Sequence, residues 1–143
     1  MSDINIVPIN EVSQKRIGVV CLPGLESFLP AIVDHLKKDY VVRTCYSRSV
    51  QDIESIVAWA DLVWIEWCNE LAIEMTNKLV VLAGKKVVIR LHSYEALSNY
   101  VPAVNWKVVD SVIFVADHIK DIVLKQFPKL AALVEMHVVN NGV

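Results

Sequence analysis

The stretch DLVWIEWCNELAIEMTNKLVVLAGKKVVIRL (residues 61–91) contains one complete strand–helix–strand unit. Residues 61–66 and 86–91 are short runs dominated by β-branched and aromatic side chains, which predicts two strands. Between them, residues 69–83 have the length of a helix, and Gly84 stands just past its end, where a left-handed residue is favoured. Because a helix-sized crossover joins parallel strands, this unit predicts an α/β fold.

The same alternation continues on both sides of this unit. It predicts a doubly wound α/β fold, with a mainly parallel six-stranded Rossmann-like sheet and helices on both faces. We interpret residues 1–15 as an irregular lead-in and residues 16–143 as one domain, the usual number for a chain of 143 residues. The other strands are predicted at 16–22, 40–45, 110–115 and 134–139, and further helices follow the predicted caps Ser27, Ser49 and Asp117.

Composition narrows the class of protein. The chain has 55% hydrophobic and 21% charged residues and a net charge of −2, so its overall charge gives no reason to expect nucleic acid. No apolar run reaches the roughly 18 residues of a membrane span. The three cysteines are odd in number and match no zinc or CxxC spacing, which indicates reduced thiols in a cytoplasmic protein and no metal site.

The fold itself predicts where a ligand should bind. In open α/β sheets, ligands lie beyond the carboxyl ends of the strands, at the point where the strand order reverses. If the order is 3-2-1-4-5-6, that crevice lies between the first and fourth strands. It would then be lined by residues 23–26, which include Gly24, Leu25 and Glu26, and by residues 92–95, which include His92, Ser93 and Glu95.

The loop after the first strand has two interpretations. Gly24 follows Pro23, and a type II turn would need glycine there for its positive φ. A functional glycine would instead let a phosphate approach the backbone at the start of the next helix. The dinucleotide fingerprint GxGxxG and the phosphate loop GxxxxGK[ST] are both absent, so we expect no nucleotide cofactor.

The loop after the fourth strand contains a histidine that directly follows a strand. His92 could donate a hydrogen bond to a phosphate oxygen or a substrate hydroxyl, or it could be a structural residue with a satisfied ring. Glu95, three residues on, could orient His92 or bind a hydroxyl. It could equally be a solvated loop carboxylate.

Two further charged residues lie within the strands. Glu66 ends the third strand between two tryptophans, so its carboxylate needs a partner or a wet edge. It could point into the crevice or pair with a nearby arginine or lysine. Arg90 shares a strand face with His92 because both positions have the same parity, and it could bind an anion or pair with Glu66.

Three segments together resemble the first half of GT-B glycosyltransferases, above all the large retaining family 4, which uses nucleotide-sugars. They are VIRLHSYE (88–95), SVIFVA (111–116) and VVNNGV (138–143). In that family the first Rossmann-like domain carries a Gly-containing loop after strand one and a His just after strand four. It ends at an Asn-Gly-Val segment that leads into the second domain. The resemblance covers residues 16–143.

This resemblance implies an acceptor-binding N-terminal domain whose donor-binding second domain is absent from this sequence. The partners would be a hydroxyl acceptor, sugar or glycan, and a nucleotide-sugar donor bound mostly by the second domain. His92 matches the family's catalytic-cleft His, and residues 24–26 match the loop that faces the donor diphosphate. Asn141 and Gly142 match the hinge between domains. We therefore expect the 143-residue chain by itself to transfer no sugar measurably.

Other interpretations stay open. The loop after the first strand has one glycine where many relatives have two. The chain could instead be a complete small α/β binding or interaction module without catalysis. A flavodoxin-like module would need a Ser/Thr-rich phosphate loop after the first strand, and a receiver would need clustered acids there, and residues 21–24 have neither. An interaction domain would show a crevice filled by side chains. Membrane association of the acceptor is also left open.

Overall fold

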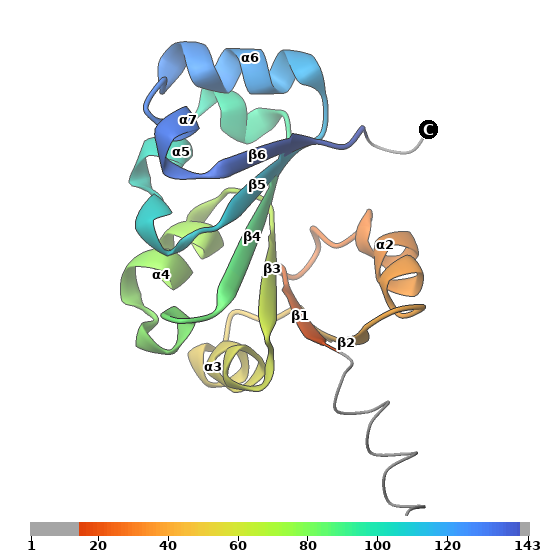
Figure 1. Ribbon diagram of the computed structural model, residues 1–143. Coiled ribbons are helices and arrows are strands. Elements are labelled where there is room, and N and C mark those ends of the chain that lie inside the picture. Colours follow the sequence, from red (N-terminus) through yellow and green to blue (C-terminus); the bar gives the residue numbers. More distant parts are fainter. Residues whose placement is uncertain (1–14, 141–143) are drawn as a thin grey trace, which may run out of the picture.

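Six parallel strands form a single sheet in the computed structural model, which describes residues 15–140 (Figure 1). Every pair of neighbouring strands is parallel, which confirms the predicted α/β fold. The strands are β1 (Arg16–Val20), β2 (Val41–Cys45), β3 (Leu62–Glu66), β4 (Lys86–Leu91), β5 (Ser111–Phe114) and β6 (Glu135–Val138). Most of the predicted lead-in and the Asn141–Gly142 segment lie outside the described residues.

The strand order differs from the expected 3-2-1-4-5-6. It is β2-β1-β3-β4-β5-β6, so the order reverses between β1 and β3 and not between the first and fourth strands. Burial explains the difference. The central residues of β3, Val63 and Ile65, are fully buried, whereas Val41, Arg43 and Thr44 of β2 are exposed. A strand with polar, exposed positions suits the sheet edge, and an apolar strand belongs in its interior.

The helices cover the two faces of the sheet unequally. α2 lies on one side of the sheet, while α3, α4, α5 and α7 lie on the other (Figure 1). The helices are α2 (Leu29–Leu36), α3 (Val50–Trp59), α4 (Glu70–Lys78), α5 (Tyr100–Ala103), α6 (Asp117–Gln126) and α7 (Leu130–Leu133), with short 3-10 turns at Val80–Leu82, Tyr94–Leu97 and Trp106–Val108. The predicted helix at 69–83 is therefore an α-helix followed by a separate turn.

Alternation along the strands sends side chains into two hydrophobic cores. One core lies under α2 and contains Ile17, Val19 and Cys21 of the β1 segment. The other lies on the opposite face and is larger, with Val63, Val87 and Val112 at its centre. No helix within residues 15–140 has the length and apolar character to cross a membrane. Cys21, Cys45 and Cys68 are free thiols.

Two of the predicted helix caps are wrong. Ser49 is a cap, because its hydroxyl accepts a hydrogen bond from the Asp52 amide at 3.4 Å. Phe28, and not Ser27, is the residue before α2, and no side chain caps that helix; the Leu29 amide donates to the backbone oxygen of Glu26 instead. Asp117 is the first residue of α6 and Ala116 precedes it, so Asp117 lies inside the helix, where its charge still favours the N-terminal end.

Candidate functional site

Three charged or titratable side chains meet at the carboxyl ends of β3 and β4. Glu66 is the last residue of β3, Arg90 the fifth of β4, and His92 follows β4 directly. Glu66 Oε2 lies 2.6 Å from Arg90 Nη1 and 2.9 Å from His92 Nε2. All three side chains are buried. This confirms that Arg90 and His92 share a face and that Arg90 pairs with Glu66.

The carboxylate of Glu66 determines the tautomer of His92. An ionised carboxylate only accepts hydrogen bonds, so the 2.9 Å contact favours a hydrogen on His92 Nε2, and the donor Arg90 Nη1 lies farther from the same nitrogen, at 3.4 Å. In a neutral imidazole, Nδ1 then carries the lone pair. Glu66 Oε1 also accepts a hydrogen bond from Trp64 Nε1 at 3.0 Å, so both carboxylate oxygens are held in place. The pair can therefore orient a histidine as a hydrogen-bond acceptor or base.

Two aromatic rings stack on His92. The indole of Trp67 lies 3.8 Å from the imidazole with an angle of 22° between the planes, and the ring of Phe28 lies 5.3 Å away at 28°. Phe28 is itself 43% exposed, whereas His92 is 3% exposed. The guanidinium of Arg90 also lies 5.6 Å from the Phe28 ring centre. Because His92 is 3% exposed, a ligand would have to displace a neighbouring side chain to contact its ring.

Trp67 has a strained backbone at this position. Its φ is 75°, a left-handed value that a bulky residue rarely adopts. The Trp67 amide donates to the Arg90 backbone oxygen at 2.9 Å, and its indole N–H donates to the Leu25 backbone oxygen at 2.8 Å. These two bonds tie the β3 loop to β4 and to the β1 loop, across the point where the strand order reverses. Such strain is found most often at functional sites.

The loop after β1 is a tight turn whose backbone amide is bonded to a carboxylate of the same loop. Gly24 has a φ of +89°, and the Leu25 amide donates to the Leu22 oxygen at 3.2 Å, which supports the turn interpretation of Pro23–Gly24. The Gly24 amide donates to Glu26 Oε1 at 2.7 Å. A phosphate that bound to this amide would have to replace the Glu26 carboxylate.

Glu95 holds the loop that carries His92. It is fully buried, so the solvated interpretation is wrong. Its Oε1 accepts hydrogen bonds from the amides of His92 at 3.1 Å and Cys68 at 2.7 Å, and thereby joins the ends of β3 and β4. Glu95 Oε2 and Asn69 Nδ2 are buried and have no hydrogen-bond partner among the described residues. Ser93 is exposed.

Cys21 lies beneath this cluster and remains protonated. Burial, and to a smaller extent the negative charges of Glu66 and Glu26, raise the pKa of its thiol to about 12. A neutral thiol is a poor nucleophile, so Cys21 contributes packing and no thiolate chemistry at neutral pH. Within residues 15–140, no three His, Cys, Asp or Glu side chains are grouped so that they could hold a metal ion.

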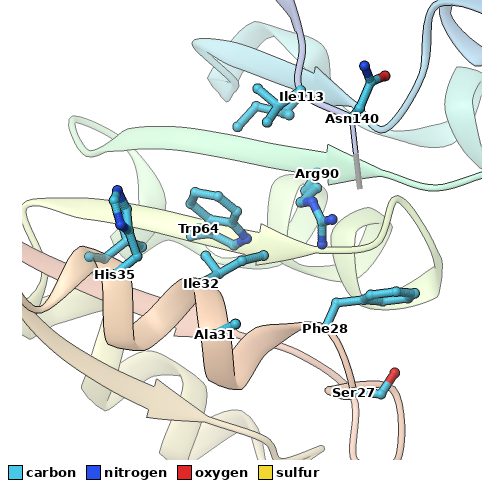
Figure 2. A pocket seen from close by; sticks show the side chains of 11 residues that line it. Ser27, Phe28, Ala31, Ile32, His35, Trp64, Arg90, Ile113 and Asn140 are labelled. Carbon is cyan, nitrogen blue, oxygen red and sulfur yellow. The ribbon is translucent and has the colours of Figure 1, made fainter. Parts of the chain in front are cut away.

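The cluster borders a large apolar cavity. A space of about 530 Å³ opens between α2 and the strands, and Phe28 and Arg90 line the end nearest His92 (Figure 2). Trp64, Ile32 and Ile113 line its apolar walls. Sequence reasoning named Glu66, Arg90, His92 and Glu95 as candidates, and the structure brings these four together; it did not select Phe28 or Trp67 as site residues. The one sequence signal for Trp67 was its position directly after Glu66, at the carboxyl end of β3.

Comparisons of this chain with protein-family models, with curated proteins and with solved structures find no match. Inferences about function therefore start from the topology and from the cluster of Glu66, Arg90 and His92. We call this cluster, together with Phe28 and Trp67, the His92 site.

Proposed function

We propose that the chain contains the acceptor-binding domain of a nucleotide-sugar-dependent glycosyltransferase of GT-B type, resembling the retaining family 4. The observation that carries the proposal is His92, placed directly after β4 and oriented by Glu66 Oε2 at 2.9 Å. It is the residue that the resemblance places in the catalytic cleft. The location of the His92 site at the carboxyl ends of the strands, beside the reversal between β1 and β3, supports the same proposal.

The reaction would transfer a hexosyl group to a hydroxyl. The acceptor oxygen forms a bond to the anomeric carbon, and the bond from that carbon to the diphosphate oxygen breaks. The nucleoside diphosphate leaves with the electron pair and takes up the hydroxyl proton. In this scheme His92 positions the acceptor hydroxyl through Nδ1 or, when protonated, donates to the diphosphate, and it belongs to the chain's half of a two-domain cleft.

A second candidate function is a binding or interaction module without catalysis. The observation that favours it is the cover over His92, because Phe28 and Trp67 stack on the ring and leave it 3% exposed. Glu66 also forms an ion pair with Arg90, in which Oε2 lies 2.6 Å from Nη1. A crevice filled in this way already pairs the charges of Glu66 and Arg90 without a ligand.

Nuclear magnetic resonance of the tryptophan indoles distinguishes the two functions. The chain has four tryptophans, so four indole N–H signals report on it, and Trp67→Phe assigns the one at the His92 site. The probes are UDP-glucose, GDP-mannose, lactose and maltose. We expect at least one of them to shift the Trp67 signal and to leave that of Trp106, buried elsewhere with its N–H bonded to Val101, unchanged.

Matched histidine variants provide the control. His92→Gln should abolish the shift, whereas His118→Gln, at an exposed position of α6, should leave it intact. Phe28→Ala should strengthen binding if the ring must move aside. If none of the four probes shifts Trp67 in either the parent chain or Phe28→Ala, the proposal fails and the interaction module is favoured. Sugar transfer by the chain itself would contradict the expected need for a second domain.

A further inference from the structure

A large part of one sheet face lies uncovered within residues 15–140. In β3, β4 and β5, the fully buried Val63, Val87 and Val112 point away from α2, and their neighbours on the α2 side are only half-buried. Those neighbours are Trp64, Val88 and Ile113. Parallel sheets are normally covered on both faces, so an apolar face of this kind favours a covering segment.

Two cavities form one groove along this face. The cavity of about 530 Å³ beside the His92 site and another of about 450 Å³ share the lining residues Leu36, Trp64 and Ile113. The first ends at Phe28, at the carboxyl edge of the sheet (Figure 2). The second ends at Lys15, at the amino edge. We call this continuous space between α2 and β3–β5 the sheet groove.

Residues 1–14 are joined covalently to Lys15, at the amino end of this groove. Lys15 lines it, and residues 1–14 precede Lys15 without a linker. Fourteen residues span about 21 Å as a helix and roughly 46 Å when extended. A strand of five residues such as β3 is only about 17 Å long. Residues 1–14 are therefore long enough to run the length of the groove, and the covalent connection keeps their local concentration high.

The chemistry of this segment complements the groove. Residues 1–14 contain five branched apolar side chains, among them Ile4, Ile6 and Ile9, and their only charged side chains are the acids Asp3 and Glu11. The amino end of the groove carries the cations Lys15 and Lys86. The one acid in that lining, Asp61, is paired with Arg16 at 3.4 Å. An apolar segment with acidic ends thus fits an apolar groove with a basic end.

We propose that residues 1–14 pack into the sheet groove and cover Trp64, Val88 and Ile113. The segment then covers the part of this sheet face that α2 leaves uncovered. The proposal rests on the groove and on the sequence of residues 1–14, and it holds whether or not the chain binds sugars.

The direct test is nuclear Overhauser contact between isoleucine methyl groups in the full 143-residue chain. We expect contacts from Ile4, Ile6 or Ile9 to Ile32 and Ile113 on the groove walls. The double variant Ile6→Ser/Ile9→Ser should abolish them, and the matched variant Asn5→Ser/Asn10→Ser, which changes polar positions of the same segment, should keep them. Absence of any such contact in the parent chain would overturn the proposal.

Iodide quenching of Trp64 gives a second measurement, isolated as the difference between the parent chain and Trp64→Phe. Ile6→Ser/Ile9→Ser, or a chain that begins at Lys15, should raise the quenching constant of Trp64 several-fold. An unchanged constant would contradict the proposal. Protection of Trp64 that appears only together with a doubled mass in light scattering would mean that a second copy covers the face, and the proposal would then be wrong.

Discussion

At the residue scale, the parity of one strand determined most of the His92 site. Arg90 and His92 are two positions apart, so their side chains lie on the same face, and Glu66 is paired with Arg90 across the neighbouring strand. The sequence could not indicate which carboxylate would be solvated. Glu95 is buried because it satisfies two amides from separate loops, and that contact exists only after β3 and β4 are side by side.

Removing the Glu66 carboxylate should strongly destabilise the protein. Glu66→Ala takes the partner from buried Arg90 and His92, and we expect the free energy of unfolding in urea to fall by about 3–5 kcal/mol. The matched change Glu54→Ala, at an exposed position of α3, should alter it by less than about 0.5 kcal/mol. If Glu66→Ala lowered the free energy of unfolding by less than about 1 kcal/mol, the Glu66–Arg90 ion pair would be as weak as a solvent-exposed one, and the prediction would be wrong.

At the element scale, strands were easier to predict than helix ends. All six strands lie within about two residues of the predicted ranges, because each is a short run rich in β-branched residues with polar or turn residues at its ends. Ser27 and Asp117 were predicted to be helix caps. At α2 a backbone hydrogen bond takes the place of the Ser27 side chain, and at α6 Asp117 is already the first residue of the helix. A serine before an apolar run predicts a helix start only to within a residue.

A matched pair of serine variants tests the helix starts. Ser49→Ala removes the hydroxyl that accepts the Asp52 amide, so it should lower the free energy of unfolding by about 1 kcal/mol. Ser27→Ala should have almost no effect, since Ser27 caps no helix. Urea unfolding of both variants measures the difference. Equal losses in the two would mean that Ser27 has a capping contact after all.

At the scale of the whole molecule, one sheet divides the protein into two unequal cores. The larger core lies under α3–α7, and the smaller one lies under α2 and includes Cys21. Cys68 is buried in the larger core. Burial raises the pKa of both thiols above 9.0, so each contributes to the stability of the fold only while it is protonated.

This burial predicts a loss of stability at alkaline pH. The thiols ionise near pH 9.0 in the unfolded chain and only well above it in the folded one, so the unfolded state binds fewer protons there. The contribution of Cys21 is complete below pH 9.0 and is lost as the pH rises toward about 12, and that of Cys68 falls in the same direction. Urea unfolding from about pH 8 to about pH 11 should show this decline. Cys21→Ala/Cys68→Ala should flatten it, and an identical profile in that variant would contradict the prediction.

The sequence by itself determined the class of fold, the six strands and the placement of the Arg90 and His92 side chains on the same face of the sheet. These follow from local sequence pattern and strand parity, which do not depend on the order of the strands in the sheet. Only the tertiary structure decided the order of the strands, the burial of Glu95, and the stacking of Phe28 and Trp67 on His92. The physical reason is that these features are contacts between segments far apart in sequence, and such contacts depend on which strand occupies the interior of the sheet.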